Sequence, residues 1–539
     1  MKSIKALKKK FGTAEAPAKP RRFVSGALRL DMQNGNLGAV SYHGVEVLRG
    51  ISWLVRDENW GTCPSRVGKI TGKKEKGEVH LSYAAKARHG GSTLTWKARI
   101  RLSPQELTFT VTARPDTDFR TNRTGFVVLH PITGVAGKPL TVKHVDGTIT
   151  RSRFPKLISP GQPFFNIAAL SHAPAPGLKA TVSMEGHKFE MEDQRNWGDA
   201  SFKTYVCSLL DPWPYVLKAG ENFTQTIRLQ ITGAPRKTKP RPQKAKPRLR
   251  GLPALGLSIA PADAAATLSH MSLLRNLCPD FLTCFMDQHT SGATLQCYAD
   301  LARQSGLPIT LELVVPGQRS AEDEVREATR AIADVHLHPQ AVVITQAQDL
   351  KSFQPTDIRP PGPSFEELAA AARRHFPSAR IGGGMISYFA ELNRKRPPQG
   401  VFDFITHSIC PIVHDASDSA VMQTLETLPH IFASAKAIIG KAPYHLGPTT
   451  IAARMNPYGA DVTPNPNNRR ICLAPNDPRQ FGSFAVAWNK GLLDAAARAG
   501  LKRVTLGGLC GPRGLLDSKG KPTPLFVFLR SWQARSKSS

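Results

Sequence analysis

The chain has 539 residues, of which 41% are hydrophobic and 21% charged, and its formal net charge is +31. These proportions are typical of globular protein, and the length exceeds what one hydrophobic core usually serves, so we expect at least two domains. No apolar run reaches the roughly 18 residues of a membrane span, and the basic N-terminus lacks the apolar segment of a secretory signal.

Neither the cysteines nor the histidines have the spacing of a metal site. The 8 cysteines are scattered without a Cys-x2-Cys pair, and most lie in apolar runs, where a reduced thiol behaves as a small hydrophobe. Of the histidines near barrel strands, 289, 407, 414 and 445, no two stand at i,i+4. We therefore expect no metal, no cofactor and a cytoplasmic location.

The N-terminal part of the chain has two regions. Residues 1–21 are basic and we expect them to be a disordered tail. Residues 22–234 consist of short alternating runs, such as "STLTWKARIRL" and "ELTFTVTARP", with turn residues about every ten positions. That spacing predicts an all-β sandwich, and its size suggests a large sandwich of the sugar-mutarotase kind.

A basic, proline-rich segment follows at 235–250, "PRKTKPRPQKAKPRLR". Pro240, Pro242 and Pro247 prevent a regular element, and the like charges repel one another, so we expect an extended linker. No nucleic-acid-binding motif accompanies it. Weak phosphate attraction follows from the charge, but we expect no specific nucleic-acid partner.

Residues 251–539 alternate apolar runs with amphipathic helical stretches. The strand candidates are 255–260, 281–286, 309–315, 341–345, 380–384, 402–408, 444–450 and 503–509. Eight strand–helix units in this length predict a (β/α)8 barrel, with a doubly wound sheet as the alternative. The glycines of "IGGGM" at 381–385 lack the spacing of a nucleotide-binding loop and indicate close backbone packing.

Barrel active sites lie at the C-terminal ends of the strands. Glu312 in the third strand, Asn393 after the fifth and His407 at the end of the sixth are the candidates there. Retaining glycosidases need two carboxylates at such ends, but the fourth strand ends "ITQAQD" and the seventh "LGPTTI". The sequence therefore does not support glycosidase chemistry of that kind.

One polar stretch stands apart from the rest, "EMEDQRNWGDASFKTY" at 190–205. Its alternation places Glu190, Glu192 and Gln194 on one face of a strand that leads into a turn. Trp197 and Tyr205 are suited to stacking on a sugar ring. The structural alternative is a salt-bridged hairpin at a sheet edge.

This stretch, with "DPWPYVLKAGE" after it and "LHPITGVAGKPLTVKHVDG" before it, closely resembles the D-apionate lactonase family of bacterial apiose catabolism. The barrel resembles the same family through "IGGGMISYFAELNRKRPP" and "NPNNRR", and the likeness covers roughly 30–515. The resemblance implies a β domain followed by a barrel, and hydrolysis of D-apionolactone, a small sugar lactone, to D-apionate. It also implies a further small β domain, for which the sequence up to Ser539 has no counterpart.

Lactone opening needs a base to activate water, donors for the oxyanion and an acid for the leaving alkoxide. We expect Glu192 or His407 to be the base, and Arg195 or Lys203 to stabilise the oxyanion. The expected substrate-binding residues are Glu190, Gln194, Asn196, Trp197, Asp199, Tyr205, Glu312 and Asn393. Two alternatives stay open: a non-catalytic or drifted carbohydrate-binding protein, and a glycoside-hydrolase-like enzyme acting on another sugar.

Overall fold

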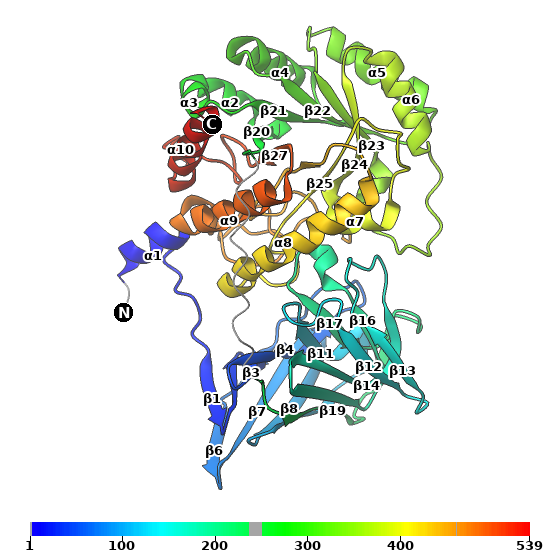
Figure 1. Ribbon diagram of the computed structural model, residues 1–539, viewed down its shortest axis with the longest axis vertical. Helices are drawn as coiled ribbons and strands as arrows, with labels where there is room; N and C mark the ends of the chain where they lie inside the picture. The colour runs from blue at the N-terminus through cyan, green and yellow to red at the C-terminus, as the bar shows by residue number, and fades with distance from the viewer. Residues whose placement is uncertain (1–2, 237–250, 460, 539) are drawn as a thin grey trace. The chain divides into compact units, whose positions relative to one another are not determined.

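The computed structural model describes residues 3–236, 251–459 and 461–538, which separate into two compact units (Figure 1). The β unit contains Ala18–Gln194 and Ala200–Gln243, and the barrel unit contains Met1–Pro17, Arg195–Asp199 and Lys244–Ser539. The five residues Arg195–Asp199 therefore belong with the barrel, although the strands on either side of them belong to the β unit. The expected boundaries, 22–234 and 251–539, take no account of this segment.

Short antiparallel strands make up the β unit, as the alternating runs predict. They are β1 (Arg21–Ser25), β2 (Leu28–Gln33), β3 (Asn36–Tyr42), β4 (Val45–Arg56), β5 (Arg66–Val67), β6 (Thr71–Glu75), β7 (Glu78–His89), β8 (Ser92–Leu102), β9 (Glu106–Pro115), β10 (Phe119–Thr121), β11 (Arg123–Pro131), β12 (Pro139–His144), β13 (Ile149–Arg153), β14 (Phe164–Ala175), β15 (Leu178–Glu185), β16 (Phe189–Glu192), β17 (Ser201–Val206), β18 (Tyr215–Leu217) and β19 (Phe223–Gly233). All except β10 and β18, which pair with each other, join one large sheet among the described residues.

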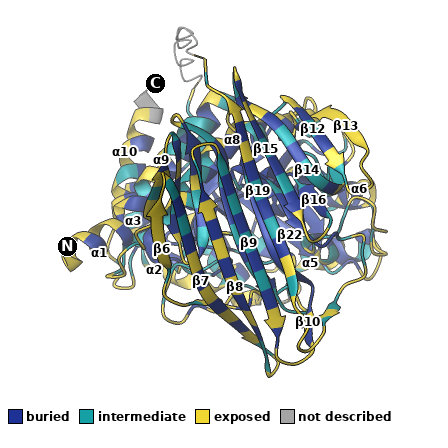
Figure 2. Cartoon of the chain, turned by 90° about the horizontal axis from the view of Figure 1, so that it is seen from below, coloured by how far each residue is buried: buried dark blue, intermediate teal, exposed yellow. Residues whose placement is uncertain are grey.

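The hydrophobic core of this unit is formed by the inward-facing residues of its strands. Along β7, β8 and β9 every second residue is buried, and Figure 2 shows the resulting pattern of exposed and buried residues. The inward rings of Phe109 and Phe126 meet edge to face at 4.9 Å, and Trp53 packs on Phe126 at 5.0 Å. Each such buried aromatic side chain contributes about 1.5–3 kcal/mol. The predicted β-sandwich is confirmed.

The barrel unit is built on eight parallel strands. They are β20 (Ala254–Ile259), β21 (Phe281–Met286), β22 (Ile309–Val315), β23 (Ala341–Gln346), β24 (Arg380–Tyr388), β25 (Phe404–Ser408), β26 (His445–Leu446) and β27 (Arg503–Leu506). Their order is β25-β24-β23-β22-β21-β20-β27-β26, and parallel bridges from Ile405 to Tyr444 and from Ile409 to Thr449 close the ring. All eight predicted strands are present, and the barrel is confirmed.

Helices cover the outside of this ring (Figure 1). They are α2 (Ala264–Ser269), α3 (Met271–Leu277), α4 (Gly292–Ser305), α5 (Ala321–Ala333), α6 (Phe365–His375), α7 (Phe389–Lys395), α8 (Asp418–Ile439), α9 (Ser483–Ala499) and α10 (Pro524–Ser538). Local signals set their ends: Ser364 and Glu367 form a capping box at the start of α6. In the described residues no helix is long and apolar enough to cross a membrane.

Two glycines let large aromatic rings fill the barrel interior. A Cβ added at Gly256 would lie 2.2 Å from the ring of Phe281, and one added at Gly382 would lie 2.3 Å from the ring of Phe404. Only a residue without a side chain fits opposite these rings. Gly382 lies in the "IGGGM" run, so close packing accounts for that glycine.

The expectation of a disordered N-terminal tail is wrong for the residues that form a helix. Residues Ile4–Phe11 form helix α1, capped by the Ser3 side chain and ended by Gly12 in the left-handed region at φ 68°. Leu7 and Phe11 are buried, and the ring of Phe11 packs on Phe484 of α9 at 5.9 Å. This amphipathic helix is stabilised by the packing of its apolar face. The many lysines of the segment obscure that apolar face in the sequence. Most of the expected 235–250 linker, from 237 onward, lies outside the described residues.

Candidate active site

A histidine–carboxylate pair lies at the C-terminal end of the barrel. His414 follows β25 in the loop to α8, and its Nδ1 lies 2.7 Å from Oδ2 of Asp199 in the Arg195–Asp199 turn. The two side chains keep 23% and 17% of their surface exposed, so water and small molecules reach them. A carboxylate at Nδ1 fixes the imidazole tautomer, which leaves Nε2 as the basic nitrogen.

Trp197 forms an aromatic wall beside this pair. Its ring lies 6.0 Å from the ring of His414, 6.3 Å from Tyr388 and 4.7 Å from Tyr458, with the Arg394 guanidinium 5.3 Å from its centroid. Only 3% of Trp197 is exposed. Protein side chains cover the ring, which packs against His414, and the expected stacking of Trp197 on a substrate stays a prediction.

The other residues of the turn anchor it to the barrel helices. Asn196 accepts a hydrogen bond of 2.8 Å from Asn393 of α7. Arg195 is fully buried and donates to Nδ1 of His430 in α8 at 2.9 Å. Burial, and then the charge of Arg195, lowers the pKa of His430 to about 4, so the imidazole is neutral and accepts. Arg195, Asn196 and Asn393 thus position the turn.

Glu312 holds an arginine, Arg454, at the same end of the barrel. Glu312 is buried in β22 and forms a two-point ion pair with Arg454, whose Nη1 lies 3.1 Å from Oε1. The Arg454 side chain is 14% exposed and lies over the ring of Phe285. Tyr388 donates to the carbonyl of the next residue, Met455, at 2.7 Å, which ties this loop to the Trp197 wall.

A second charged pair lies deeper in the unit. Glu391 and Lys395 of α7 are i,i+4 neighbours with their charges 2.9 Å apart and almost no exposed surface. Burial lowers the pKa of Lys395, while Glu391 opposes that shift. Lys395 also donates to the carbonyl oxygens of Asp349 and Lys351. This pair fastens α7 to the loop after β23.

The strand residues of the polar stretch are engaged within the β unit. Glu190 is fully buried and accepts from the hydroxyls of Tyr205 and Ser208 and from the amide of Leu209. The Tyr205 ring also carries the Arg123 guanidinium 3.8 Å from its centroid. Burial and hydrogen bonds within the sheet occupy both side chains, which favours a structural role, and the substrate contacts expected of Glu190 and Tyr205 stay predictions.

Glu192 and Lys203 pair with each other across β16 and β17, as their register predicts. Both side chains are mostly buried, at 15% and 12% exposed. Gln194 accepts from the Ser201 hydroxyl at 2.7 Å. The ion pair matches the salt-bridged hairpin alternative, and the catalytic roles expected of Glu192 and Lys203 stay predictions.

His407 lies on the outer face of its strand, so the catalytic role expected of it stays a prediction that its position does not support. Phe404, the inward residue of β25, stacks on His445, whereas His407 points to the helices and contacts Phe389 of α7. Nε2 of His407 lies 2.5 Å from the Tyr444 hydroxyl, and burial lowers the pKa of the imidazole to about 4. The sequence shows a period of two but not which face of the strand lines the barrel.

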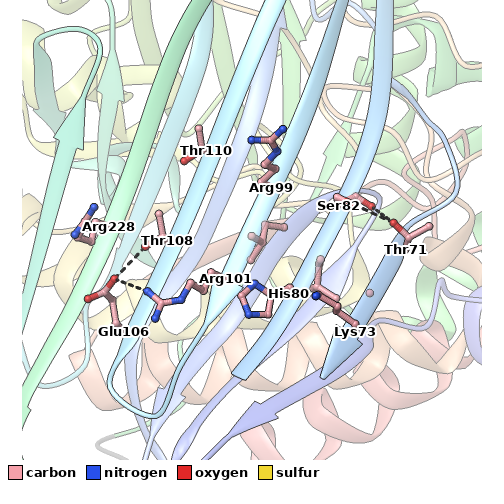
Figure 3. Close-up of a pocket in the computed structure, with 13 residues that line it drawn as sticks. Thr71, Lys73, His80, Ser82, Arg99, Arg101, Glu106, Thr108, Thr110 and Arg228 are labelled. Carbon is pink, nitrogen blue, oxygen red and sulfur yellow. Dashed lines mark hydrogen bonds and ion pairs between the residues drawn. The ribbon is translucent and has the colours of Figure 1, made fainter. Parts of the chain in front are cut away.

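The β unit carries a hollow of about 710 Å³ on the outer face of its sheet (Figure 3). Arg99, Arg101 and Arg228 line it together with Thr108, and Glu106 contacts Arg101. None of the expected site residues lines this hollow. We therefore place the candidate active site at the barrel loops, where His414 and Asp199 meet.

Sequence reasoning selected Asp199, Asn196 and Trp197 through the polar stretch, but it did not select His414 or Arg454 as candidate site residues. Both lie in long loops after barrel strands, where no periodic pattern marks them. Their position after strands six and seven was the available signal.

Comparison with known proteins agrees with this architecture. A family model described as the D-apionate lactonase N-terminal domain matches residues 8–234, and one described as its TIM barrel domain matches 255–537. A protein of Brucella anthropi named D-apionate lactonase is 41% identical over 538 residues, which covers 97% of this chain and 88% of that protein.

Solved structures show only distant likeness. A putative aldose 1-epimerase of Escherichia coli K12 is 12% identical over 40% of this chain and 99% of its own, with a TM-score of 0.28. An α-galactosidase of Lactobacillus brevis is 9% identical over 96% of this chain and 83% of its own, also at 0.28. Scores this low carry no functional argument, whereas the two family models and the Brucella relative show that this chain belongs to the D-apionate lactonase family.

Proposed function

We propose that this chain hydrolyses D-apionolactone to D-apionate, with His414 as the general base. Family membership supports the substrate class, since the relative of 41% identity is named D-apionate lactonase. The observation that carries the mechanism is the accessible His414–Asp199 pair, 2.7 Å apart, at the end of the barrel where active sites of this fold lie.

The reaction proceeds through a tetrahedral intermediate. Nε2 of His414 removes a proton from water as the water oxygen bonds to the lactone carbonyl carbon, and the carbonyl oxygen becomes an oxyanion. Collapse of the intermediate re-forms the C=O bond and breaks the ring C–O bond. The imidazolium then returns its proton to the leaving alkoxide, so His414 ends neutral and one hydroxy acid is released.

Two further side chains assist hydrolysis of the lactone. Asp199 is a positioning residue: its carboxylate accepts a hydrogen bond from Nδ1–H of His414 and stabilises the imidazolium that forms. Arg454 is the proposed partner of the oxyanion, because Glu312 fixes its guanidinium in a partly exposed position. Phe285 beneath the guanidinium restricts its movement further.

The test follows acid release from D-apionolactone with the purified protein. We expect turnover by the wild type and a fall in kcat of about 10²–10⁴-fold in His414→Gln. His338→Gln is the matched control, because His338 is exposed before β23, at the opposite end of the barrel strands. Turnover by the wild type that His414→Gln leaves unchanged would overturn the mechanism. Binding of the sugar acid without turnover by the wild type would instead indicate a carbohydrate-binding protein.

We further propose that the enzyme acts in the cytoplasm. Cys284, Cys410 and Cys510 are buried thiols without disulfides, which suits a reducing compartment. Fractionation of cells that produce the protein tests this, and recovery outside the cytoplasmic fraction would contradict it.

A further inference from the structure

A tight loop in the β unit presents a carboxylate and a thiol side by side. The loop joins Asp57 to Cys63 after β4, and backbone bonds from Asp57 to Gly61 and from Cys63 to Val55, both 3.0 Å, close it. A Cβ added at Gly61 would lie 2.2 Å from Oδ2 of Asp57, so the loop packs directly against that carboxylate. The backbone here holds Asp57 in one position.

Three possible ligand atoms of different chemistry converge at this loop. A carboxylate oxygen of Asp57, the Sγ of Cys63 and a ring nitrogen of His89, the last residue of β7, all lie within 4.8 Å of one another. Cys63 is 5% exposed, while Asp57 and His89 are half-buried. Backbone amides of Asn59 and Gly61 bond to Oδ1 of Asp57, which leaves Oδ2 as the oxygen for a ligand.

A second carboxylate orients the histidine. Nε2 of His89 lies 2.8 Å from Oε2 of Glu58, a contact in which a protonated Nε2 donates to Glu58 and Nδ1 keeps its lone pair. Histidines that bind metals nearly always donate their other N–H in this way. Asn122 anchors the loop further by donating to the carbonyl oxygens of Asp57 and Glu58.

We propose that Asp57, Cys63 and His89 bind one divalent transition-metal ion, and that Zn²⁺ is the ion this donor set fits. Thiolate, imidazole and carboxylate are the ligands that zinc takes in proteins. A tetrahedral zinc ion spaces its ligands roughly 3.5 Å apart, so small side-chain movements bring these three atoms to coordination distance. The fourth position is open to water.

This site is independent of the proposed lactone chemistry. All of its residues belong to the β unit, and none belongs to the His414–Asp199 site. The site departs from the expectation of no metal. Residues 57, 63 and 89 match no common metal-site spacing, and only the folded chain brings them together. Bound metal ties the 57–63 loop to the end of β7.

The test is titration of the metal-free, full-length protein with Co²⁺, a coloured substitute for Zn²⁺. We expect one equivalent of Co²⁺ to produce a thiolate-to-cobalt charge-transfer band that Zn²⁺ abolishes. Cys63→Ser removes the band, while Cys207→Ser, which changes another buried thiol of the same unit, keeps it. Glu58→Gln keeps the band and weakens Co²⁺ binding by about 10–100-fold.

Several results would overturn the site. They are the absence of a charge-transfer band in the wild type, a band that persists in Cys63→Ser, and binding of unchanged affinity in His89→Gln. Circular dichroism checks that each variant folds. If Cys63→Ser does not fold, His89→Gln decides the question, because His89 is only half-buried and its removal leaves the core intact.

Discussion

The strands and the turn of the Glu190–Tyr205 stretch use their polar residues in different ways. In the strands, Glu190 is bound by Tyr205, and Glu192 by Lys203, within the β unit. In the turn, Asp199 pairs with His414 of a barrel loop. Strand side chains have fixed neighbours at a set register, whereas a turn projects its side chains toward whatever segment packs against it. The same polar sequence therefore supplies stability in one part and a candidate site in the other.

The largest expected effect is on the turn. Asp199→Asn leaves the size of the side chain but removes the charge that holds His414, so we expect kcat to fall by about 10²–10⁴-fold while KM changes little. The thermal midpoint should stay near that of the wild type, because both side chains are partly exposed. Steady-state kinetics and melting curves measure both, with Asp118→Asn in the β unit as the control. A stability loss that accounts for the lost activity would make Asp199 a structural residue instead.

The strands should show the opposite behaviour. Glu190→Gln replaces one of the two carboxylate oxygens that accept three hydrogen bonds with an NH2 donor in a fully buried place, so we expect the free energy of unfolding to fall by about 1–3 kcal/mol. The kcat of the folded protein should not change. Urea unfolding measures the loss, and Glu185→Gln on the exposed face of β15 serves as the control. Loss of turnover at wild-type stability would return Glu190 to the substrate site.

Acid should destabilise both units through buried histidines. Burial lowers the pKa of His172 in β14 and of His407 in β25 to about 4 each, below the ordinary value of 6.5. Above pH 6.5 both are neutral in the folded and unfolded chain and their full contribution to stability is present. As the pH falls from 6.5 to 4, the unfolded chain takes up protons first and the folded state loses about 1.4 kcal/mol per pH unit for each histidine.

Unfolding in urea at a series of pH values checks this dependence. We expect His172→Phe, which keeps the aromatic packing against Phe154, to flatten the loss of stability below pH 6. His407→Phe should flatten it too, at the cost of an unpaired Tyr444 hydroxyl at every pH. An unchanged slope in both variants would show that these histidines do not control acid unfolding.

The smallest effect is expected at the Glu192–Lys203 pair. Glu192→Gln should change the free energy of unfolding by about 1 kcal/mol, since the amide oxygen of Gln can still accept a hydrogen bond from Lys203, and turnover should persist. A double-mutant cycle with Lys203→Met measures the coupling between the two charges. A kcat reduced by a hundredfold or more in Glu192→Gln would instead support the predicted role of Glu192 as base.

Most of the fold could be predicted because its signals are local. Period-two runs predicted the β unit, and eight apolar runs predicted the barrel strands, with Phe281–Met286 and Ile309–Val315 matching their predicted ranges. The basic tail was misjudged because charge concealed the amphipathic spacing of Leu7 and Phe11. The site was predicted only in part. The polar stretch located Asp199, but period two could not tell the inner face of β25 from the face that carries His407.

The sequence by itself determined the two fold types and the family. These depend on neighbours a few residues apart or on an ordered run of rare residues. Only the tertiary structure decided that Asp199 meets His414, 215 positions along the chain, and that His89 lies beside Asp57 and Cys63. Such contacts depend on how strands and loops pack, and the type of residue at one position does not indicate which distant residue will contact it.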